Sequence, residues 1–74
     1  MTDASELLYL AATAKADLRT GIESLRKAIE NFQILVDDDP QNKTQLLILS
    51  HLRTALRHAA KASDNVFTYI RALP

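Results

Sequence analysis

The stretch Asp37-Asp38-Asp39-Pro40 is the strongest helix-breaking signal in this chain of 74 residues. Proline lacks the N–H that a helix interior needs and clashes with the preceding turn, so no α-helix passes through Pro40 undisturbed. The residue before a proline is pushed out of helical conformation, so we expect Asp39 to be non-helical. Aspartate is a good N-cap and proline suits the first helical position. We therefore expect a second helix to begin at Pro40 with Asp39 as its cap; the alternative is one continuous helix with a kink.

Apolar residues repeat at helical spacing on both sides of this break. In the first half they step by three or four residues with a mean of about 3.6, the period of a straight α-helix. This first stripe consists of Leu7, Ala11, Ala14, Leu18, Ile22, Leu25, Ile29, Phe32 and Val36. The second stripe consists of Leu49, Leu52, Leu56, Ala59, Ser63, Val66, Ile70 and Leu73, and Ala60 and Phe67 widen one of its edges.

No segment shows the alternation of a strand or the glycine-rich turn of a strand hairpin. The sequence therefore predicts an all-α fold, a single helical hairpin of two long antiparallel amphipathic helices over residues 1–74. We expect the first helix over about 3–36, the turn over about 37–39 and the second helix over about 40–73. A turn centred near residue 39 pairs positions whose numbers add up to about 78, so Leu25 and Leu56 are expected to lie opposite each other or nearly so.

The first helix has a start signal and one weak point. Asp3 and Glu6 have the spacing of a capping box, with Thr2 as the competing cap. Gly21 is the only glycine, and in a helix interior it costs about 1 kcal/mol relative to alanine. It lies beside the apolar stripe, so it marks either a close approach of another helix or an ordinary tolerated weak spot. Glu23–Lys27 and Arg26–Glu30 have the favourable spacing of four residues for ion pairs.

Composition excludes several classes of protein. The chain has no cysteine, which rules out disulfides and thiolate metal sites. The apolar run Leu46 to Leu49 is far short of the roughly 20 residues of a membrane span. The acidic start differs from the basic beginning of a signal peptide. We therefore expect a soluble, cytoplasmic protein without a membrane association.

No pattern of catalytic or cofactor-binding residues is present. His51 and His58 lie seven residues apart, but no acidic residue has a ligand spacing beside them, and a metal site needs three or four converging ligands. The run Asp37-Asp38-Asp39 lacks the glycine and terminal glutamate of a calcium loop. Phosphate loops and nucleophile motifs are also missing. We expect no enzyme activity, no cofactor and no metal.

Apolar residues exceed what one seam between two helices can cover. A single seam cannot bury the stripe residues together with further large side chains, and exposed apolar patches usually mark a partner surface. The spacing Ile48-Ala55-Ala62-Tyr69, with small residues between large ones, fits close approach by a partner helix. The expected partner-binding residues are Leu10, Leu35, Leu47, Ile48, Ala55, Ala62 and Tyr69. Self-association into a dimeric four-helix bundle would bury the same surface and is the alternative.

Charge is unevenly distributed although the net charge is zero. Residues 1–39 hold eight acids and four bases, and residues 40–74 hold one acid and five bases. This asymmetry favours antiparallel pairing of the halves or a charged partner. Arg53, Arg57 and Lys61 step by four along one helix face and could follow phosphates, which makes a helical-hairpin nucleic-acid-binding protein a further alternative. A solvated face, or a match to the acidic first helix, explains three bases better, so nucleic acid is the weaker interpretation.

The whole pattern resembles one family of small bacterial proteins. A chain of about 70 residues with two long amphipathic helices, the junction Asp39-Pro40-Gln41, no cysteine and surplus apolar surface is similar to the small E-component co-chaperones of type III secretion systems (YscE/SsaE-like). The resemblance implies a cytoplasmic co-chaperone that binds a larger helical-repeat co-chaperone. Together the two would keep the needle subunit soluble and unpolymerised. The family has no chemical motif, so the resemblance assigns no functional residue.

The needle subunit itself is the neighbouring alternative. Needle subunits are hairpins of similar size with a proline-containing turn, and they often end much as residues 69–74 do, Tyr-Ile-Arg-Ala-Leu-Pro. Against this, the N-terminal arm is short, capped and strongly apolar, whereas needle subunits have a polar, flexible arm. The second proline that needle turns typically carry just before the Asp-Pro pair is also missing.

Overall fold

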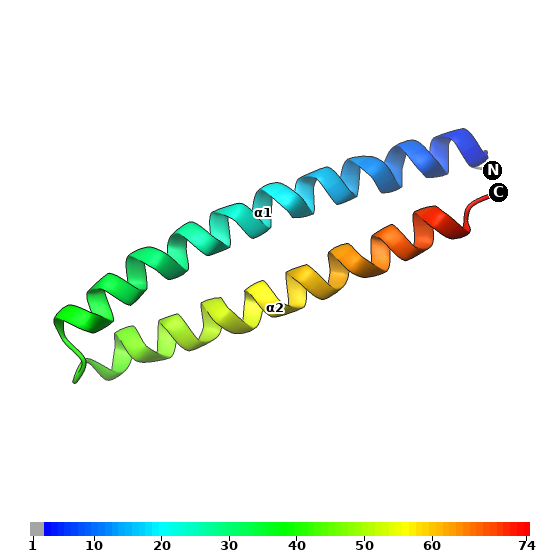
Figure 1. The fold of residues 1–74 in the computed structure, drawn as a ribbon. Coiled ribbons are helices and arrows are strands. Elements are labelled where there is room, and N and C mark those ends of the chain that lie inside the picture. The colour runs from blue at the N-terminus through cyan, green and yellow to red at the C-terminus, as the bar shows by residue number, and fades with distance from the viewer. Residues whose placement is uncertain (1–2) are drawn as a thin grey trace.

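A computed structural model describes residues 3–74 as two long helices packed side by side. Helix α1 spans Ala4–Asp38 and helix α2 spans Lys43–Ala72. They run antiparallel, so the start of α1 and the end of α2 lie together at the end opposite the turn (Figure 1). The molecule measures 54 × 18 × 14 Å, close to the length of one 35-residue helix rising about 1.5 Å per residue. The predicted all-α helical hairpin is confirmed, and the single kinked helix is excluded.

The start of α1 follows the predicted cap. The backbone N–H of Glu6 donates a hydrogen bond of 2.8 Å to the Asp3 carboxylate, so Asp3 is the N-cap. This bond satisfies one of the N–H groups that have no partner within the helix. Thr2, the competing cap, lies outside the described residues.

The turn differs from the prediction at both of its ends. Helix α1 continues through Asp37 and Asp38, and Asp39 is its C-cap, with its N–H donating to the Leu35 carbonyl at 3.0 Å. Asp39 is non-helical (φ −140°, ψ 76°), as the following proline requires. Pro40 lies in the turn and does not begin the second helix.

The N-cap of α2 is Asn42. Its side-chain oxygen accepts a hydrogen bond of 3.0 Å from the N–H of Gln45, and α2 begins at Lys43. The expectation that Asp39 caps a helix starting at Pro40 is therefore wrong. The reason is that asparagine is as good an N-cap as aspartate, and Asn42 with Gln45 has the spacing of a capping box. A cap at this later position leaves room for a turn closed by the bond from the Asn42 N–H to the Asp39 carbonyl, 3.1 Å.

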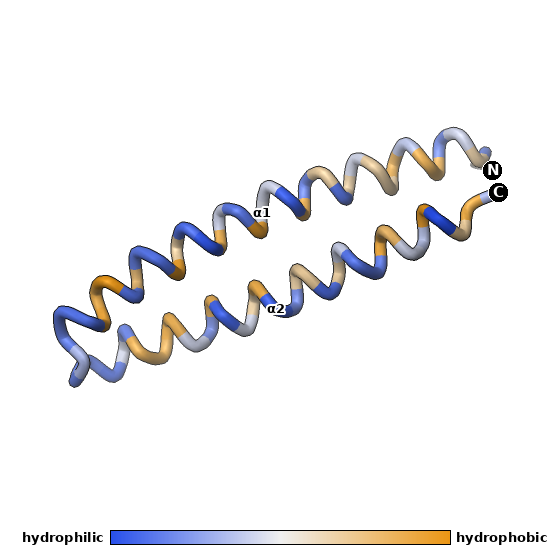
Figure 2. Tube along the Cα trace, in the orientation of Figure 1, coloured by the Kyte–Doolittle hydropathy of each residue, from blue (hydrophilic) through white to orange (hydrophobic). Residues whose placement is uncertain are grey.

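The predicted stripes form the seam between the helices. Of the nine residues in the first stripe, all except Ala14 are at least partly buried, and all eight of the second stripe are. Figure 2 shows hydrophobic residues along the facing sides of the two helices. Only Val36 and Leu49 are buried in the described part of the chain, with 7% and 4% of their surface exposed. Both belong to the turn half of the hairpin, so this half holds the best-covered core.

The register is shifted from the predicted one because the turn comes later in the chain. Asp38 and Lys43 flank the turn, and their numbers add up to 81. Lys15 lies over the ring of Phe67, a pair whose numbers add up to 82. This register brings Leu25 and Leu56, whose numbers add up to 81, to about the same level along the hairpin. Both are partly buried.

Candidate partner-binding surface

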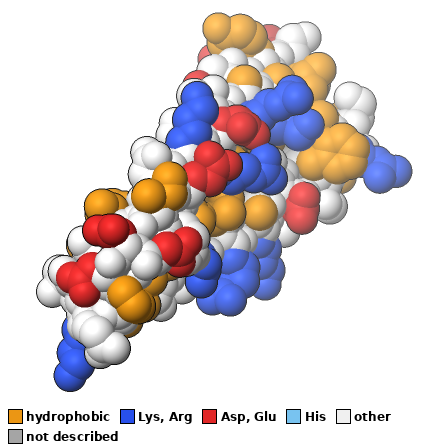
Figure 3. All heavy atoms as spheres, turned by 60° about the vertical axis from the view of Figure 1, so that its left-hand side comes forward, with side chains coloured by type: hydrophobic (Ala, Val, Ile, Leu, Met, Phe, Trp, Pro, Cys, Tyr) orange, Lys and Arg blue, Asp and Glu red, His pale blue; other side chains and the backbone are white. Residues whose placement is uncertain are grey.

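The hairpin leaves much of its apolar surface uncovered. Among residues 3–74, ten large hydrophobic side chains are exposed, against two that are buried. The exposed ones are Leu8, Tyr9, Leu10, Ile34, Leu35, Leu46, Leu47, Ile48, Phe67 and Tyr69. Figure 3 shows hydrophobic side chains at both ends and across the middle of one face of the molecule, interspersed with basic and acidic ones. Monomeric proteins rarely expose large contiguous apolar surfaces, and such patches mark interaction sites.

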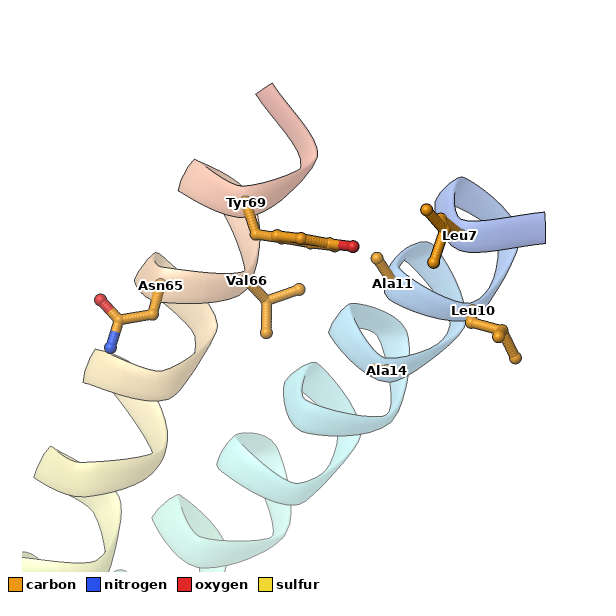
Figure 4. A pocket seen from close by; sticks show the side chains of 7 residues that line it. All are labelled: Leu7, Leu10, Ala11, Ala14, Asn65, Val66 and Tyr69. Atoms are coloured by element: carbon orange, nitrogen blue, oxygen red, sulfur yellow. The ribbon is translucent and has the colours of Figure 1, made fainter. Parts of the chain in front are cut away.

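One groove lies beside the seam at the open end of the hairpin. It has a volume of about 430 Å³ and is lined by Leu7, Leu10, Ala11, Ala14, Asn65, Val66 and Tyr69. In Figure 4 the ring of Tyr69 extends from α2 across towards Ala11 on α1. The groove therefore brings together two of the predicted partner-binding residues, Leu10 and Tyr69, although they are far apart in the sequence.

The same side of the hairpin continues from this groove towards the turn. Residues seven apart lie on nearly the same face of a helix, with a drift of about 20°. From Ala14 these steps lead to Gly21, Ala28 and Leu35 on α1. From Tyr69 they lead back to Ala62, Ala55 and Ile48 on α2. The same steps lead from Leu10 to Asp17, Ser24 and Asn31, and from Asn65 back to His58 and His51, so polar residues flank this apolar row. We call this surface the apolar face, and its residues from the predicted set are Leu10, Leu35, Ile48, Ala55, Ala62 and Tyr69.

The apolar face has large residues at its ends and small ones in its middle. Leu10 and Tyr69 form the end near the termini, whereas Leu35 and Ile48 form the end near the turn. All four are exposed, as is Ala55, whereas Ala62 is partly buried. Small residues let a neighbouring backbone approach closely, so the middle of this face is the place where a partner helix can lie closest.

Gly21 contributes to that small middle. A Cβ built on Gly21 has nothing within 4 Å. A close approach of another helix was one of the two explanations for Gly21. Within the hairpin, α2 does not approach it in this way. The space above it is open in the hairpin and available to another chain.

Leu47 lies apart from the other predicted partner-binding residues. It is 56% exposed, but it directly precedes Ile48 and therefore points about 100° away from it around the helix. Leu47 thus lies outside the apolar face, although sequence reasoning placed it in the same set.

A second groove lies on the other side of the seam. It has a volume of about 990 Å³, and its lining includes Lys15, Arg19, Arg26 and Phe67. Lys15 directly follows Ala14, and Phe67 directly follows Val66, so each lies about 100° round its helix from a residue of the first groove. We call this second surface the cationic groove.

Sequence reasoning did not single out the cationic groove. Phe67 was expected to widen the edge of the apolar stripe, but it is 46% exposed. Its ring has the ammonium group of Lys15 at 5.0 Å from its centroid and the guanidinium carbon of Arg71 at 5.6 Å. Only the register between the helices brings Lys15 to Phe67, so the pattern within either helix alone does not reveal the pair.

The ion pair beside this groove differs from the expected ones. Arg26 pairs with Glu23 at 2.8 Å, three residues away, and it is the one ion pair within residues 3–74. The expected pairs Glu23–Lys27 and Arg26–Glu30 are not formed, because Glu23 and Arg26 engage each other. Both side chains are well exposed, so the pair contributes little to stability.

The row of bases considered for nucleic-acid binding is interrupted. Arg53 donates a hydrogen bond of 2.6 Å to the side-chain oxygen of Gln33 on α1. Arg57 and Lys61 are exposed. The first of the three bases is therefore already engaged within the hairpin.

The part of the chain that the structure describes offers no metal site. No group of three or more His, Asp or Glu side chains among these residues is arranged to hold a metal ion. Neither α1 nor α2 combines the length and apolar character needed to cross a membrane.

Comparison with protein-family models, with curated proteins and with solved structures finds no match for this chain.

Proposed function

We propose that this hairpin is a protein-binding adaptor whose apolar face is covered by a partner chain. The observation that carries the proposal is the imbalance between two buried and ten exposed large apolar side chains. A chain of this size buries little surface and is marginal alone unless another component helps. Covering the apolar face with a partner would supply the missing burial.

We propose further that the adaptor is an E-component co-chaperone of a bacterial type III secretion system, acting in the cytoplasm. The size of the chain, its hairpin form and its uncovered apolar face support this assignment, together with the resemblance described above. In this role the hairpin binds a larger helical-repeat co-chaperone. The pair then keeps the needle subunit soluble and unpolymerised.

The shape of the apolar face favours a different chain over a second copy. One whole side of the hairpin measures 54 × 18 Å, roughly 970 Å², which is the upper limit for an interface on this side, and a standard interface takes about 800 Å² per partner. In a symmetric dimer through this face, the large ends of one copy would meet the large ends of the other. The small residues at the middle of each face would then meet one another, and small side chains make fewer contacts than large ones. A partner with large side chains at its centre fits better.

Co-expression tests the proposal. The chain is produced with the helical-repeat co-chaperone and the needle subunit of the same type III system, and the soluble fraction is separated by size. We expect one complex that contains all three proteins. Omitting the hairpin should send the helical-repeat protein or the needle subunit into the insoluble fraction.

Other outcomes identify the alternatives. Fibres formed by the hairpin alone would indicate a needle subunit. A stable homodimer that ignores both other proteins would indicate a self-associating adaptor. Either result would overturn the co-chaperone assignment.

A further inference from the structure

The cationic groove combines an apolar floor with positive walls. Ile22 and Ile70 lie among its lining residues and are partly buried, so they form apolar surface inside the groove. Lys15, Arg19 and Arg26 supply the positive charge. Glu23 is the acidic residue of the lining, and it is paired with Arg26. The groove therefore carries a net positive charge.

Three cations at this site lack an acidic partner. Within residues 3–74, Lys15, Arg19 and Arg71 form no ion pair, because the one ion pair present joins Arg26 to Glu23. Lys15 and Arg71 lie over the Phe67 ring instead. An aromatic ring attracts a cation through its quadrupole but does not neutralise its charge. The positive field remains available to carboxylates from outside.

We propose that the cationic groove binds an acidic amphipathic segment of a protein. The carboxylates of this segment would pair with Lys15, Arg19 and Arg71, and its apolar side chains would cover Phe67 and the floor. Complementary charge of this kind gives specificity and speeds association. The proposal is independent of the proposed function, because it concerns the other side of the seam.

Nucleic acid fits the groove less well. Binding to single strands relies on bases that stack on open aromatic rings. Phe67 is the one aromatic residue in the groove lining, so the groove offers a single stacking position. The isoleucine floor also offers nothing to a phosphate backbone, and a chain of zero net charge attracts nucleic acid weakly.

A peptide titration tests the proposal on the full chain. The probe is a fluorescent peptide of about four helical turns, with leucine on one face and glutamate on the other. A matched peptide carries glutamine in place of every glutamate. Fluorescence anisotropy is measured at low and at physiological salt. We expect the acidic peptide to bind about tenfold more tightly than its glutamine counterpart, with the difference shrinking as salt rises.

Substitutions locate the binding. The double variant Lys15→Gln with Arg19→Gln should weaken binding of the acidic peptide by about tenfold. Phe67→Ala should weaken it separately, through the loss of apolar contact. The control is Arg57→Gln with Lys61→Gln, which removes the same charge outside the groove lining and should change affinity by less than about twofold. Circular dichroism verifies that each variant keeps its helicity.

Four results would overturn the proposal. The first is no binding of the acidic peptide, and the second is an equal loss in the groove and control variants. The third is tighter binding of duplex DNA or anionic phospholipid vesicles than of the peptide. The fourth is a wild-type dimer that the Lys15→Gln/Arg19→Gln variant converts to a monomer, since a second copy would then occupy the groove.

Discussion

Arg53 on α2 donates a hydrogen bond of 2.6 Å to the side-chain oxygen of Gln33 on α1. It is the one side-chain hydrogen bond that joins the helices within residues 3–74. The amide nitrogen of Gln33 donates in turn to the Asp37 carboxylate at 2.9 Å. This short polar chain lies near the turn, so most of the length of the hairpin is held by apolar contact, together with the contact of Lys15 with the Phe67 ring. Stability should therefore depend on the seam and on the caps.

The cap of α2 gives the first prediction. Asn42→Ala removes the acceptor for the Gln45 N–H and should lower the free energy of unfolding by about 1 kcal/mol. Asp39→Ala is the matched control, because Asp39 caps α1 through its backbone N–H, which alanine retains. Urea denaturation of both variants measures the difference. A larger loss for Asp39→Ala would show that the aspartate side chain performs the capping.

The core near the turn gives the second prediction. Leu49 is the most buried side chain described, and Leu49→Ala should cost about 2–4 kcal/mol because it leaves a cavity. Leu56→Ala should cost less, since Leu56 is only partly buried and water can fill the space. Thermal unfolding followed by circular dichroism compares the two. Equal losses would mean that the two positions are equally covered in solution, through an additional chain.

The sequence predicted the hairpin because two signals agreed. The apolar period of about 3.6 residues specifies two helices, and Pro40 stops a single helix. The start of α2 was missed because Asp39 and Asn42 are equally good caps, and local propensity does not decide between them. The choice depends on how many residues the turn needs to bring the helices together.

The candidate surfaces were predictable to different degrees. The exposure of Ile48 and Tyr69 was predicted from surplus apolar residues at heptad spacing, which is a property of one helix. Leu47 was grouped with them because exposure alone does not specify a direction around the helix. The cationic groove depends on Lys15 meeting Phe67 across the seam. The register between the helices determines this contact. The observed register differs from the predicted one because the turn lies later in the chain than predicted.

Gly21 gives the third prediction. Since an added Cβ meets nothing within 4 Å, Gly21→Ala should stabilise the isolated hairpin by about 0.5–1 kcal/mol through higher helix propensity. A melting temperature below that of the wild type would contradict the open space above this residue. Because Gly21 lies in the small middle of the apolar face, the same change should weaken partner binding. Higher stability together with weaker partner binding would show that Gly21 allows close packing of the partner. Higher stability with unchanged binding would show that Gly21 is a tolerated weak spot.

The last prediction uses two neighbouring residues of α2. Ile48 belongs to the apolar face and is 36% exposed, whereas Leu47 is 56% exposed and points elsewhere. If the proposed function is right, Ile48→Asp should abolish co-purification with the proposed helical-repeat partner, because the new carboxylate would be buried without a partner at the interface. Leu47→Asp should leave binding close to that of the wild type. Both variants should keep their helicity, since neither side chain is buried in the hairpin.

The two variants show whether partner binding depends on the direction of a side chain around α2 or on its exposed fraction. If hydrophobicity alone attracts the partner, Leu47→Asp should do more damage, because Leu47 exposes the larger fraction of its surface. If the apolar face binds the partner, Ile48→Asp should do more damage despite its smaller exposure. A pull-down in which both variants bind equally well would show that the partner contacts a different surface of the hairpin.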